Sequence, residues 1–436
     1  MQYNNRNKLS AAFLTLGCKV NYYETGKMVE QFQKKGFEIK DFSESADIYV
    51  VNTCTVTNIA DRKSRQMLHR AKKRNPDSIV IAVGCYVDSA GQDILKDSAI
   101  DAAFSNSEKD KIAEQVIQAF HLSPQAGTDI VPQKGRTRAY LKIQDGCNQF
   151  CSYCLIPYVR GGGVLTDMPV VEVLRQAEEL AAHGYKEIVL TGIHLSSYGV
   201  AQSEEKNFVR HGGKPLLDVI CQVADIPGIE RIRLGSLEPR IITEEFLLGL
   251  SGVDKLCPHF HLSLQSGCDK VLKRMNRHYT TVEYREKVDL LRRFFDYPAV
   301  TTDVIVGFPG ETDEEFLATR KYLSEIRLAD IHVFKYSPRA GTRAAGLDGQ
   351  ISPEIKNMRS DILLEDVKEY QREYRSYFLG REESVLFEET VTEDGVEWLA
   401  GLNERHVKIG IPIEEAVKMG YERNQIHTVT VKKILF

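Results

Sequence analysis

Three cysteines fall within one eight-residue stretch, Cys147-Asn148-Gln149-Phe150-Cys151-Ser152-Tyr153-Cys154. This spacing constrains the fold because the three thiols must converge on one point if they act together. Three thiolates leave a tetrahedral zinc site one ligand short, whereas they can hold three irons of a four-iron cube and leave the fourth iron open. The alternative is a run of buried thiols or a strand-end zinc site. The spacing favours the iron–sulfur cluster.

The composition describes a globular protein with ample core. A chain of 436 residues, 42% hydrophobic and 27% charged, suggests about three domains. We expect a cytoplasmic location and no membrane segment, because no stretch approaches the ~18 apolar residues of a span and Met1–Ser10 has no signal-like apolar region. Nine cysteines favour metal ligation or catalysis over disulfides. The net charge of −4 restricts any nucleic-acid binding to local patches.

Residues 1–122 are expected to form an N-terminal domain in which strands alternate with helices. Strands are predicted at 11–16, 47–52 and 78–83. A helix is predicted after the first strand, with Asn21 as its N-cap and Gly36 at its end. This alternation is typical of a parallel sheet in a doubly wound α/β layer.

One cysteine follows each of these three strands, namely Cys18, Cys54 and Cys85. The carboxyl ends of parallel strands meet at one edge of a sheet, and each spacing is about one βα unit. The alternative is three separate buried thiols. Repetition after three successive strands favours a second three-thiolate cluster. We therefore expect all six cysteines of the two sets to be metal ligands with catalytic roles.

A basic helix ended by Pro76 is predicted between the second and third of these cysteines. Its charged residues are Arg62, Lys63, Arg65, His69, Arg70, Lys72, Lys73 and Arg74. Most charge runs are solvated helix faces, but this density also suits contact with a phosphate backbone. Both interpretations stay open, with Arg62, Arg65, Arg70 and Lys73 as candidate RNA contacts.

Residues 123–138 are rich in Pro, Gly and polar residues and are interpreted as an interdomain linker. Strand–helix repeats then run through residues 139–375. Strands are predicted at 140–144, 187–190, 231–234, 259–264, 301–306 and 331–335. Six βα units indicate a partial parallel (β/α)6 barrel rather than a closed barrel of eight.

Small and polar residues recur where these strands end, at Thr191, Gly192, Ser236, Glu238, Ser263 and Gln265. Such positions carry the chemistry of parallel barrels. Gly192 allows close backbone approach, and Glu238 can accept hydrogen bonds from a ribose or amino group. The alternatives are a simple turn at Gly192 and a pair between Glu238 and Arg240. Repetition favours a cofactor site. We interpret the remaining cysteines and two strand histidines as structural: Cys221, Cys257, Cys268, His259 and His261.

Residues 376–436 change to short alternating runs. Strands are predicted at 384–387, 396–399, 407–409 and 427–434, with a hairpin turn at Asp394-Gly395. This pattern predicts a small five-stranded β-barrel, a fold that often binds RNA. Residues 381–436 contain seven Lys/Arg and eleven Asp/Glu. This excess of negative charge counts against general electrostatic binding of RNA, although contact through loops or one face stays open.

Together these features resemble the methylthiotransferase family of radical S-adenosylmethionine (SAM) enzymes. The motifs that carry the resemblance are Thr15-Leu16-Gly17-Cys18-Lys19-Val20-Asn21, Asn52-Thr53-Cys54-Thr55-Val56, Gly84-Cys85, the stretch at Cys147, Ser236-Leu237-Glu238-Pro239 and Gly307-Phe308-Pro309-Gly310-Glu311-Thr312. The resemblance implies an N-terminal cluster domain, a radical SAM barrel and a C-terminal TRAM barrel. Within the family, Gly-Cys-Lys-Val-Asn followed by Glu24-Thr25 resembles the branch acting on N6-threonylcarbamoyladenosine, whereas the isopentenyladenosine branch usually reads Gly-Cys-Gln-Met-Asn.

The resemblance also implies two [4Fe-4S] clusters, one on Cys147, Cys151 and Cys154 and one on the other three cysteines. Tyr153 falls where the family carries an aromatic residue near the bound SAM. The implied reaction adds a methylthio group at C2 of the modified adenosine, with two SAM molecules. The implied partners are the tRNA anticodon loop and an electron donor such as flavodoxin or ferredoxin. The alternatives are a sibling acting on isopentenyladenosine or on a ribosomal-protein aspartate, and a non-catalytic zinc protein that binds RNA.

The chain departs from the family at one place. The family commonly follows Arg-Gly with three residues and then Ser-Arg. Here Arg160-Gly161 is followed by Gly162-Gly163-Val164 and then by Leu165-Thr166. An apolar, neutral pair has replaced a polar, positively charged one, which puts in doubt the contact of that arginine with the SAM carboxylate or a phosphate.

Overall fold

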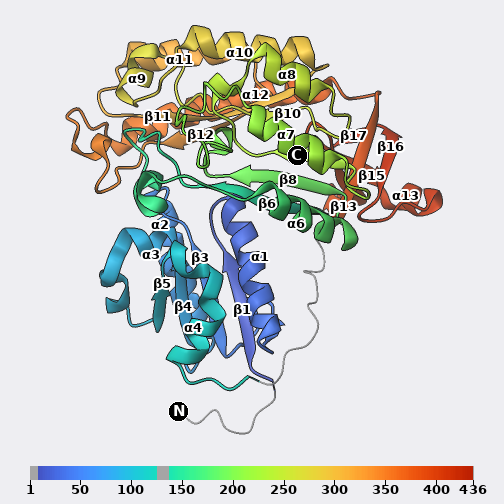
Figure 1. Cartoon of the computed structure of the whole chain (residues 1–436). Helices are drawn as coiled ribbons and strands as arrows, with labels where there is room; N and C mark the ends of the chain where they lie inside the picture. The colour runs from blue at the N-terminus through green and yellow to red at the C-terminus, as the bar shows by residue number, and fades with distance from the viewer. Residues whose placement is uncertain (1–7, 125–136, 436) are drawn as a thin grey trace.

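A computed structural model describes residues 8–124 and 137–435 of the chain. The N-terminal domain forms the lower lobe in Figure 1, the strand–helix repeats form the upper lobe, and the C-terminal sheet packs against one end of the upper lobe. Most of the predicted linker at 123–138 lies outside the described residues. In the described ranges, no helix combines the length and apolar character that a membrane crossing requires.

The lower lobe contains a five-stranded, wholly parallel sheet in the order β2-β1-β3-β4-β5. Its strands are β1 (Ser10–Thr15), β2 (Glu38–Lys40), β3 (Ile48–Thr53), β4 (Ile79–Gly84) and β5 (Ala102–Phe104). Its helices are α1 (Lys19–Lys34), α2 (Asn58–Arg74), α3 (Cys85–Ala90) and α4 (Ile112–Ala119). The three predicted strands are confirmed, and the two short edge strands β2 and β5 were not predicted.

Side chains alternate across this sheet and divide the helices between its two faces. Ile81 of β4 packs in one core with Phe32 of α1 and residues of α4. Val80 of the same strand packs in a second core with Leu68 of α2 and residues of α3. Helices therefore cover both faces, which confirms the doubly wound layer.

The predicted N-cap of the first helix is wrong. Cys18 occupies the N-cap position of α1. The Asn21 side chain instead donates hydrogen bonds to the carbonyl oxygens of Leu16, at 2.7 Å, and Thr53, at 3.0 Å. Asn21 thus ties two strand ends together, because its buried amide donates to a carbonyl oxygen at the end of each.

The upper lobe is built on six parallel strands, as predicted. They are β6 (Arg138–Asp145), β8 (Glu187–Gly192), β9 (Arg231–Leu234), β10 (His259–His261), β11 (Ala299–Val306) and β12 (Asp330–Lys335). The short β7 (Thr166–Asp167) pairs antiparallel with β6 and was not predicted. Isolated parallel bridges, such as Leu237 with Leu262, connect the β9 and β10 halves. The strands therefore form a partial barrel.

Helices surround this barrel (Figure 1). They are α5 (Ile156–Val159), α6 (Val170–Ala182), α7 (Lys214–Ala224), α8 (Glu244–Ser251), α9 (Asp269–Arg274), α10 (Thr281–Phe294), α11 (Asp313–Ile326) and α12 (Pro353–Ser376). Short 3-10 helices occupy Gly91–Lys96, Asn106–Lys111, Gly161–Gly163, Leu195–Ser197, Pro239–Ile241 and Arg343–Gly346.

Residues alternate between the two sides of the barrel strands. Outward residues such as Ile188 and Ile232 belong to one large apolar core with the helices. Their neighbours in sequence, including Glu187, Arg233 and Asp303, are polar and lie on the opposite side of the strands. The barrel lumen is therefore lined by charged and polar groups.

The C-terminal sheet is antiparallel, in the order β16-β13-β14-β15-β17. It comprises β13 (Glu382–Glu393), β14 (Val396–Asn403), β15 (Lys408–Pro412), β16 (Ile426–Thr430) and β17 (Lys433–Ile434), with α13 (Ile413–Met419) between β15 and β16. Only two residues separate β16 from β17, yet these strands occupy opposite edges. The sheet must curl until its edges meet, as predicted for a small barrel.

Buried ion pairs join this barrel to the amino ends of the upper-lobe strands. Glu187 accepts hydrogen bonds from Arg233 at 2.9 Å and Arg138 at 3.0 Å. Arg138 also pairs with Glu388, and Arg231 donates to the carbonyl oxygen of Leu402 at 3.0 Å. Burial opposes the charge on Glu187, but attraction to the two arginines outweighs it and lowers the pKa to about 2.

Candidate active site at the junction of two domains

The loop after β6 brings Cys147, Cys151 and Cys154 together, and each thiol interacts electrostatically with the other two. We call these three residues the loop triad. Ser152 anchors the loop by donating from its backbone to the Met275 carbonyl oxygen at 3.0 Å. Burial raises the pKa of Cys147 to about 11. The neutral thiol is thus favoured until a metal cation replaces its proton, which suits a cluster-binding site.

A buried arginine that the sequence analysis missed contacts this triad. Arg277 donates to the Cys151 sulfur at 3.2 Å, to the Tyr279 hydroxyl at 2.9 Å and to the Ser263 carbonyl oxygen at 3.3 Å. Tyr153 packs against a small apolar cluster that includes Phe308, and its hydroxyl interacts electrostatically with Cys151 and Cys154. The cofactor contact expected of Tyr153 stays a prediction.

The predicted cofactor residues lie at or just beyond the carboxyl ends of the strands. They differ in exposure and in how tightly their neighbours pack around them. Thr191 and Gly192 end β8, and a Cβ on Gly192 would approach the Gln144 Cβ to 2.9 Å. Ser236 is exposed beyond β9. Gln265 adopts φ 72°, and its backbone donates to the Asp303 carbonyl oxygen at 2.8 Å. The absence of a side chain at Gly192 is therefore a packing requirement.

Glu238 is already paired with a neighbour. Its carboxylate accepts from the Arg240 side chain at 2.7 Å and from the Arg240 backbone at 2.8 Å. Its backbone donates to the Ser196 hydroxyl at 2.9 Å. Ser263 contributes its carbonyl oxygen to Arg277 and Tyr279. Among the described residues, Glu238 therefore forms the pair with Arg240 that was the alternative to a cofactor contact.

Cys18, Cys54 and Cys85 also converge, each directly or shortly after its strand, and each pair interacts electrostatically. We call these residues the strand-end triad. Gly17 has φ 94°, and a Cβ there would come within 2.8 Å of the Cys54 sulfur. Only glycine fits at this position beside the Cys54 thiol. Burial raises the pKa of Cys54 to about 11, as for the loop triad.

Arg160 links the strand-end triad to the upper lobe. This buried side chain donates to the Cys85 sulfur at 3.4 Å, to Glu24 at 2.8 and 3.0 Å, to Asn21 at 2.9 Å and to Asp145 at 3.2 Å. Burial opposes the Glu24 charge, but Lys109, Arg160 and Lys142 together hold its pKa well below the usual range.

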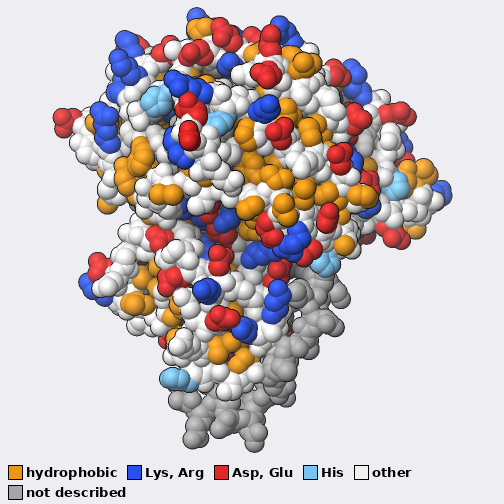
Figure 2. Space-filling model, in the orientation of Figure 1, with side chains coloured by type: hydrophobic (Ala, Val, Ile, Leu, Met, Phe, Trp, Pro, Cys, Tyr) orange, Lys and Arg blue, Asp and Glu red, His pale blue; other side chains and the backbone are white. Residues whose placement is uncertain are grey.

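The two triads adjoin each other at the junction of the lobes. Cys85 packs against Leu155 and Val159, which follow the loop triad in sequence. Arg339 makes a further bridge, pairing with Asp61 at 2.7 Å and donating to the Thr55 hydroxyl at 2.6 Å. Figure 2 shows Lys, Arg, Asp and Glu side chains gathered along the crease between the lobes. Both sets of thiols therefore face one charged junction.

The departure after Arg160 forms an apolar patch beside the loop triad. Gly161, Gly162 and Gly163 all adopt positive φ, and a Cβ on Gly163 would meet the Phe150 ring at 2.7 Å. The ring of Phe150 packs edge-on against that of Tyr158, with centroids 5.6 Å apart. The loop after Arg160 contains no arginine, so the arginine of the family's Ser-Arg pair is absent from it.

Helix α2 has one basic face. Its buried residues, Ser64, Leu68 and Ala71, face the sheet. Arg65 donates to the Tyr86 hydroxyl at 3.0 Å, whereas Arg62, Arg70 and Lys73 are exposed and have no hydrogen bond or ion pair with another described residue. These three cations are available for an anionic partner.

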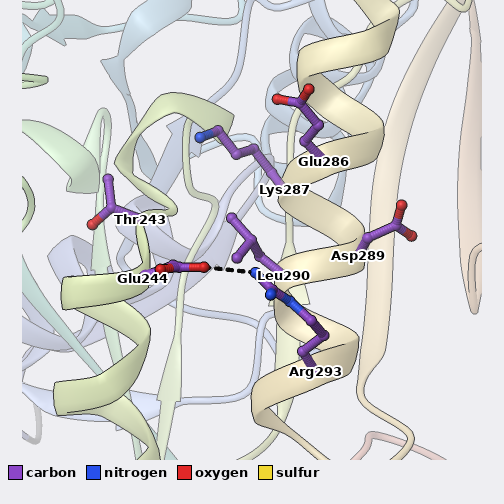
Figure 3. A pocket seen from close by; sticks show the side chains of 7 residues that line it. All are labelled: Thr243, Glu244, Glu286, Lys287, Asp289, Leu290 and Arg293. Carbon is purple, nitrogen blue, oxygen red and sulfur yellow. Dashed lines mark hydrogen bonds and ion pairs between the residues drawn. The ribbon is translucent and has the colours of Figure 1, made fainter.

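A separate depression of about 510 Å³ lies on the outer surface between α8 and α10 (Figure 3). It is lined by Thr243, Glu244, Glu286, Lys287, Asp289, Leu290 and Arg293. Glu244 and Arg293 form an ion pair across it at 2.8 Å. None of the cysteines or strand-end residues reaches this depression, so it takes no part in the site.

Two family models match the chain. Uncharacterized protein family UPF0004 matches residues 10–105, and the radical SAM superfamily matches residues 141–323. The threonylcarbamoyladenosine tRNA methylthiotransferase MtaB of Bacillus subtilis is 39% identical over 92% of this chain and 90% of its own length. The tRNA-2-methylthio-N(6)-dimethylallyladenosine synthase of Syntrophus aciditrophicus is 34% identical over 86% of this chain and 82% of its own length.

A solved structure shares the fold. The radical SAM methyltransferase TsrM of Kitasatospora setae superimposes with a TM-score of 0.52 and 15% identity, over 77% of each chain. At this identity the match supports the architecture alone.

Proposed function

The chain belongs to the radical SAM tRNA methylthiotransferases, and on that premise we propose that it modifies C2 of N6-threonylcarbamoyladenosine beside the tRNA anticodon. The higher identity to the Bacillus subtilis enzyme, whose name specifies this nucleoside, supports the assignment. We also propose the domain division expected from the sequence. It gives an N-terminal cluster domain at 1–122, a radical SAM domain at 139–375 and a C-terminal TRAM barrel at 376–436.

The observation that carries the proposal is the meeting of two three-thiol sites at one junction, bridged by Arg160. Each triad offers three ligands to a [4Fe-4S] cluster and leaves one iron for another ligand. When bound, the two clusters and SAM supply the radical and sulfur-transfer chemistry that side chains lack, since no acid or base usefully removes an aromatic C2 proton.

The residues of the chain hold and orient these groups. The loop triad would hold the cluster that binds SAM. The residues that would contact SAM are Tyr153, Thr191, Gly192, Ser236, Glu238, Ser263 and Gln265. Arg277 donates to the Cys151 sulfur and so offsets thiolate charge there. The strand-end triad would hold the second cluster, with Arg160 donating to Cys85.

The tRNA must present its base to both triads, so the nucleotide is expected to be splayed out of the anticodon loop. The basic face of α2 would contact the phosphate backbone through Arg62, Arg70 and Lys73. Arg65, also predicted as a contact, is held by Tyr86 and would contribute less. An electron donor such as flavodoxin or ferredoxin would reduce the enzyme.

The test uses the anaerobically reconstituted enzyme with two tRNA substrates, one carrying N6-threonylcarbamoyladenosine and one carrying isopentenyladenosine. Mass analysis of the digested nucleosides should show a methylthio group on the first only. A product confined to isopentenyladenosine would replace the proposal with the sibling activity. Methylthiolation of neither, together with zinc instead of iron in the protein, would favour an RNA-binding protein without catalysis.

A further inference from the structure

Lys19, the first residue of α1, extends from the lower lobe into the polar lumen of the barrel. Its amine interacts electrostatically with residues on all six parallel strands. These residues are Arg138, Glu187, Arg233, His259, Asp303 and His332. Only a position inside the lumen lies close to all six strands, so this cation from one domain occupies the interior of another.

The acidic neighbours of Lys19 are already paired with other groups. Glu187 binds Arg138 and Arg233. Asp303 lies 3.3 Å from His261 and 3.2 Å from His332. No hydrogen bond or ion pair joins the Lys19 side chain to any residue within 8–124 or 137–435. The Lys19 amine therefore has no direct partner among the described residues, and an unpaired cation shielded from water is costly until an anion meets it.

The position of this charge connects it with the reaction. Lys19 directly follows Cys18, a member of the strand-end triad. The lumen opens toward the strand ends that carry the loop triad. A nucleotide placed between the triads, with the N6 substituent of its base directed into the lumen, would bring that substituent toward the Lys19 amine.

We propose that Lys19 binds the carboxylate on the N6 substituent of the target adenine and so selects an acidic substituent over an apolar one. This inference rests on the proposed function. A threonylcarbamoyl group ends in a carboxylate that would supply the partner that the amine lacks. An isopentenyl group offers no charge and would leave the amine unpaired in the lumen. Lys19 is thus a specificity-determining residue.

The test compares two forms of one tRNA, the N6-threonylcarbamoyladenosine form and the same tRNA with its threonine carboxylate converted to a methyl ester. For the wild-type holoenzyme, we expect the ester to lower kcat/KM roughly tenfold to a hundredfold, the range of a charge-assisted hydrogen bond. Lys19→Gln should lower kcat/KM for the acid by a similar factor and use both forms equally. Lys19→Arg should keep the preference for the acid.

Lys34→Gln is the matched control, because it makes the same charge change at the exposed far end of the same helix. It should leave both values unchanged. Equal use of acid and ester by the wild-type enzyme would overturn the inference without reference to any variant. The inference would also fail if Lys19→Gln still preferred the acid while keeping wild-type iron content and 5′-deoxyadenosine formation.

These results separate the two proposals. Methylthiolation of both acid and ester at equal rates would leave the proposed function standing and remove the role of Lys19. Methylthiolation of isopentenyladenosine alone would remove the proposed function, and the inference would fall with it.

Discussion

The loop triad and the strand-end triad reach similar arrangements by different routes. The loop triad occupies eight consecutive residues of one loop, whereas the strand-end triad combines residues after three separate strands of another domain. Each has one buried arginine that donates to a thiol. Arg277 reaches Cys151 at 3.2 Å, and Arg160 reaches Cys85 at 3.4 Å.

The surroundings of these two arginines differ. Neutral oxygens of Tyr279 and Ser263 hold Arg277, so its charge remains available to the thiolates. Carboxylates of Glu24 and Asp145 hold Arg160, and these come from different lobes. Lys109 and Lys142 share these carboxylates, so Arg160 belongs to an ion-pair network that joins the two lobes. The loop triad is therefore self-contained within the upper lobe, whereas the strand-end triad depends on the contact between lobes.

The largest expected effect separates the triads by function. Cys151→Ala should abolish cleavage of SAM, because the loop triad loses one of its three ligands. Cys54→Ala should spare cleavage and block methylthio transfer, because it disrupts only the other triad. Chromatography of 5′-deoxyadenosine and mass analysis of tRNA nucleosides measure the two activities. If Cys54→Ala still produced methylthiolated tRNA, the assignment of the strand-end triad would be wrong.

Removing the arginines tests whether one triad is self-contained and the other is not. Arg160→Met breaks a buried ion-pair network, which should lower the free energy of unfolding by about 3–5 kcal/mol. The protein should also retain about half of its iron after anaerobic reconstitution and still cleave SAM. Iron analysis and urea unfolding provide these measurements.

Arg277→Met is the paired control, and it should show the reverse pattern, with SAM cleavage lost and the contacts between the lobes retained. If Arg160→Met lost cleavage as completely as Arg277→Met, the two triads would be equally dependent on the junction.

The contact between the upper lobe and the C-terminal barrel shows what ion pairs contribute where no triad is involved. The pKa of Glu187 is about 2 in the folded protein, below its unfolded value, so its stabilisation is present above about pH 4.3 and is lost as the pH falls toward 2. The loss is on the order of 3 kcal/mol.

Glu187→Gln should therefore be less stable at pH 6 and lose less of its remaining stability on acidification than the wild type. Trp398 in β14 is the one tryptophan of the chain, so its fluorescence during urea unfolding reports on this barrel at each pH. Parallel pH curves for the two proteins would contradict the assignment of Glu187.

The smallest expected effect concerns the tRNA rather than the triads. Joint replacement of Arg62, Arg70 and Lys73 by Gln should weaken tRNA binding, and each lost phosphate contact should reduce the salt slope by about one. Cleavage of SAM without tRNA should not change. Replacement of Lys270, Lys273 and Lys321 on the outer barrel helices makes the same charge change as a control. Equal weakening by both sets would mean that α2 has no special role.

Local sequence was sufficient to predict most of the fold. The strands that precede Cys54 and Cys85 are continuous apolar runs that end in small or polar residues, and a parallel sheet brings such ends together. The short edge strands β2 and β5 were missed because three residues carry no clear period.

The arginines of the site were missed for a different reason. Arg277 lies 126 residues from the cysteine that it contacts, and Arg160 lies 75 residues from its own. Nothing local distinguishes Arg277 from other arginines, and the family pattern that contains Arg160 gives no sign of its contact with Cys85. The motif at Lys19 indicated a branch of the family, but its surroundings come from six strands of a different domain and could not be predicted from the motif.

The contact of Arg160 with Cys85 has a consequence for how the protein matures. During synthesis the three thiols of the lower lobe leave the ribosome well before this guanidinium does, because the chain emerges from its amino end. Until the loop that contains Arg160 has been translated, the sulfur atoms of the strand-end triad therefore lack this hydrogen-bond donor. Loading of iron at this place is thus expected to follow assembly of both lobes rather than to precede it.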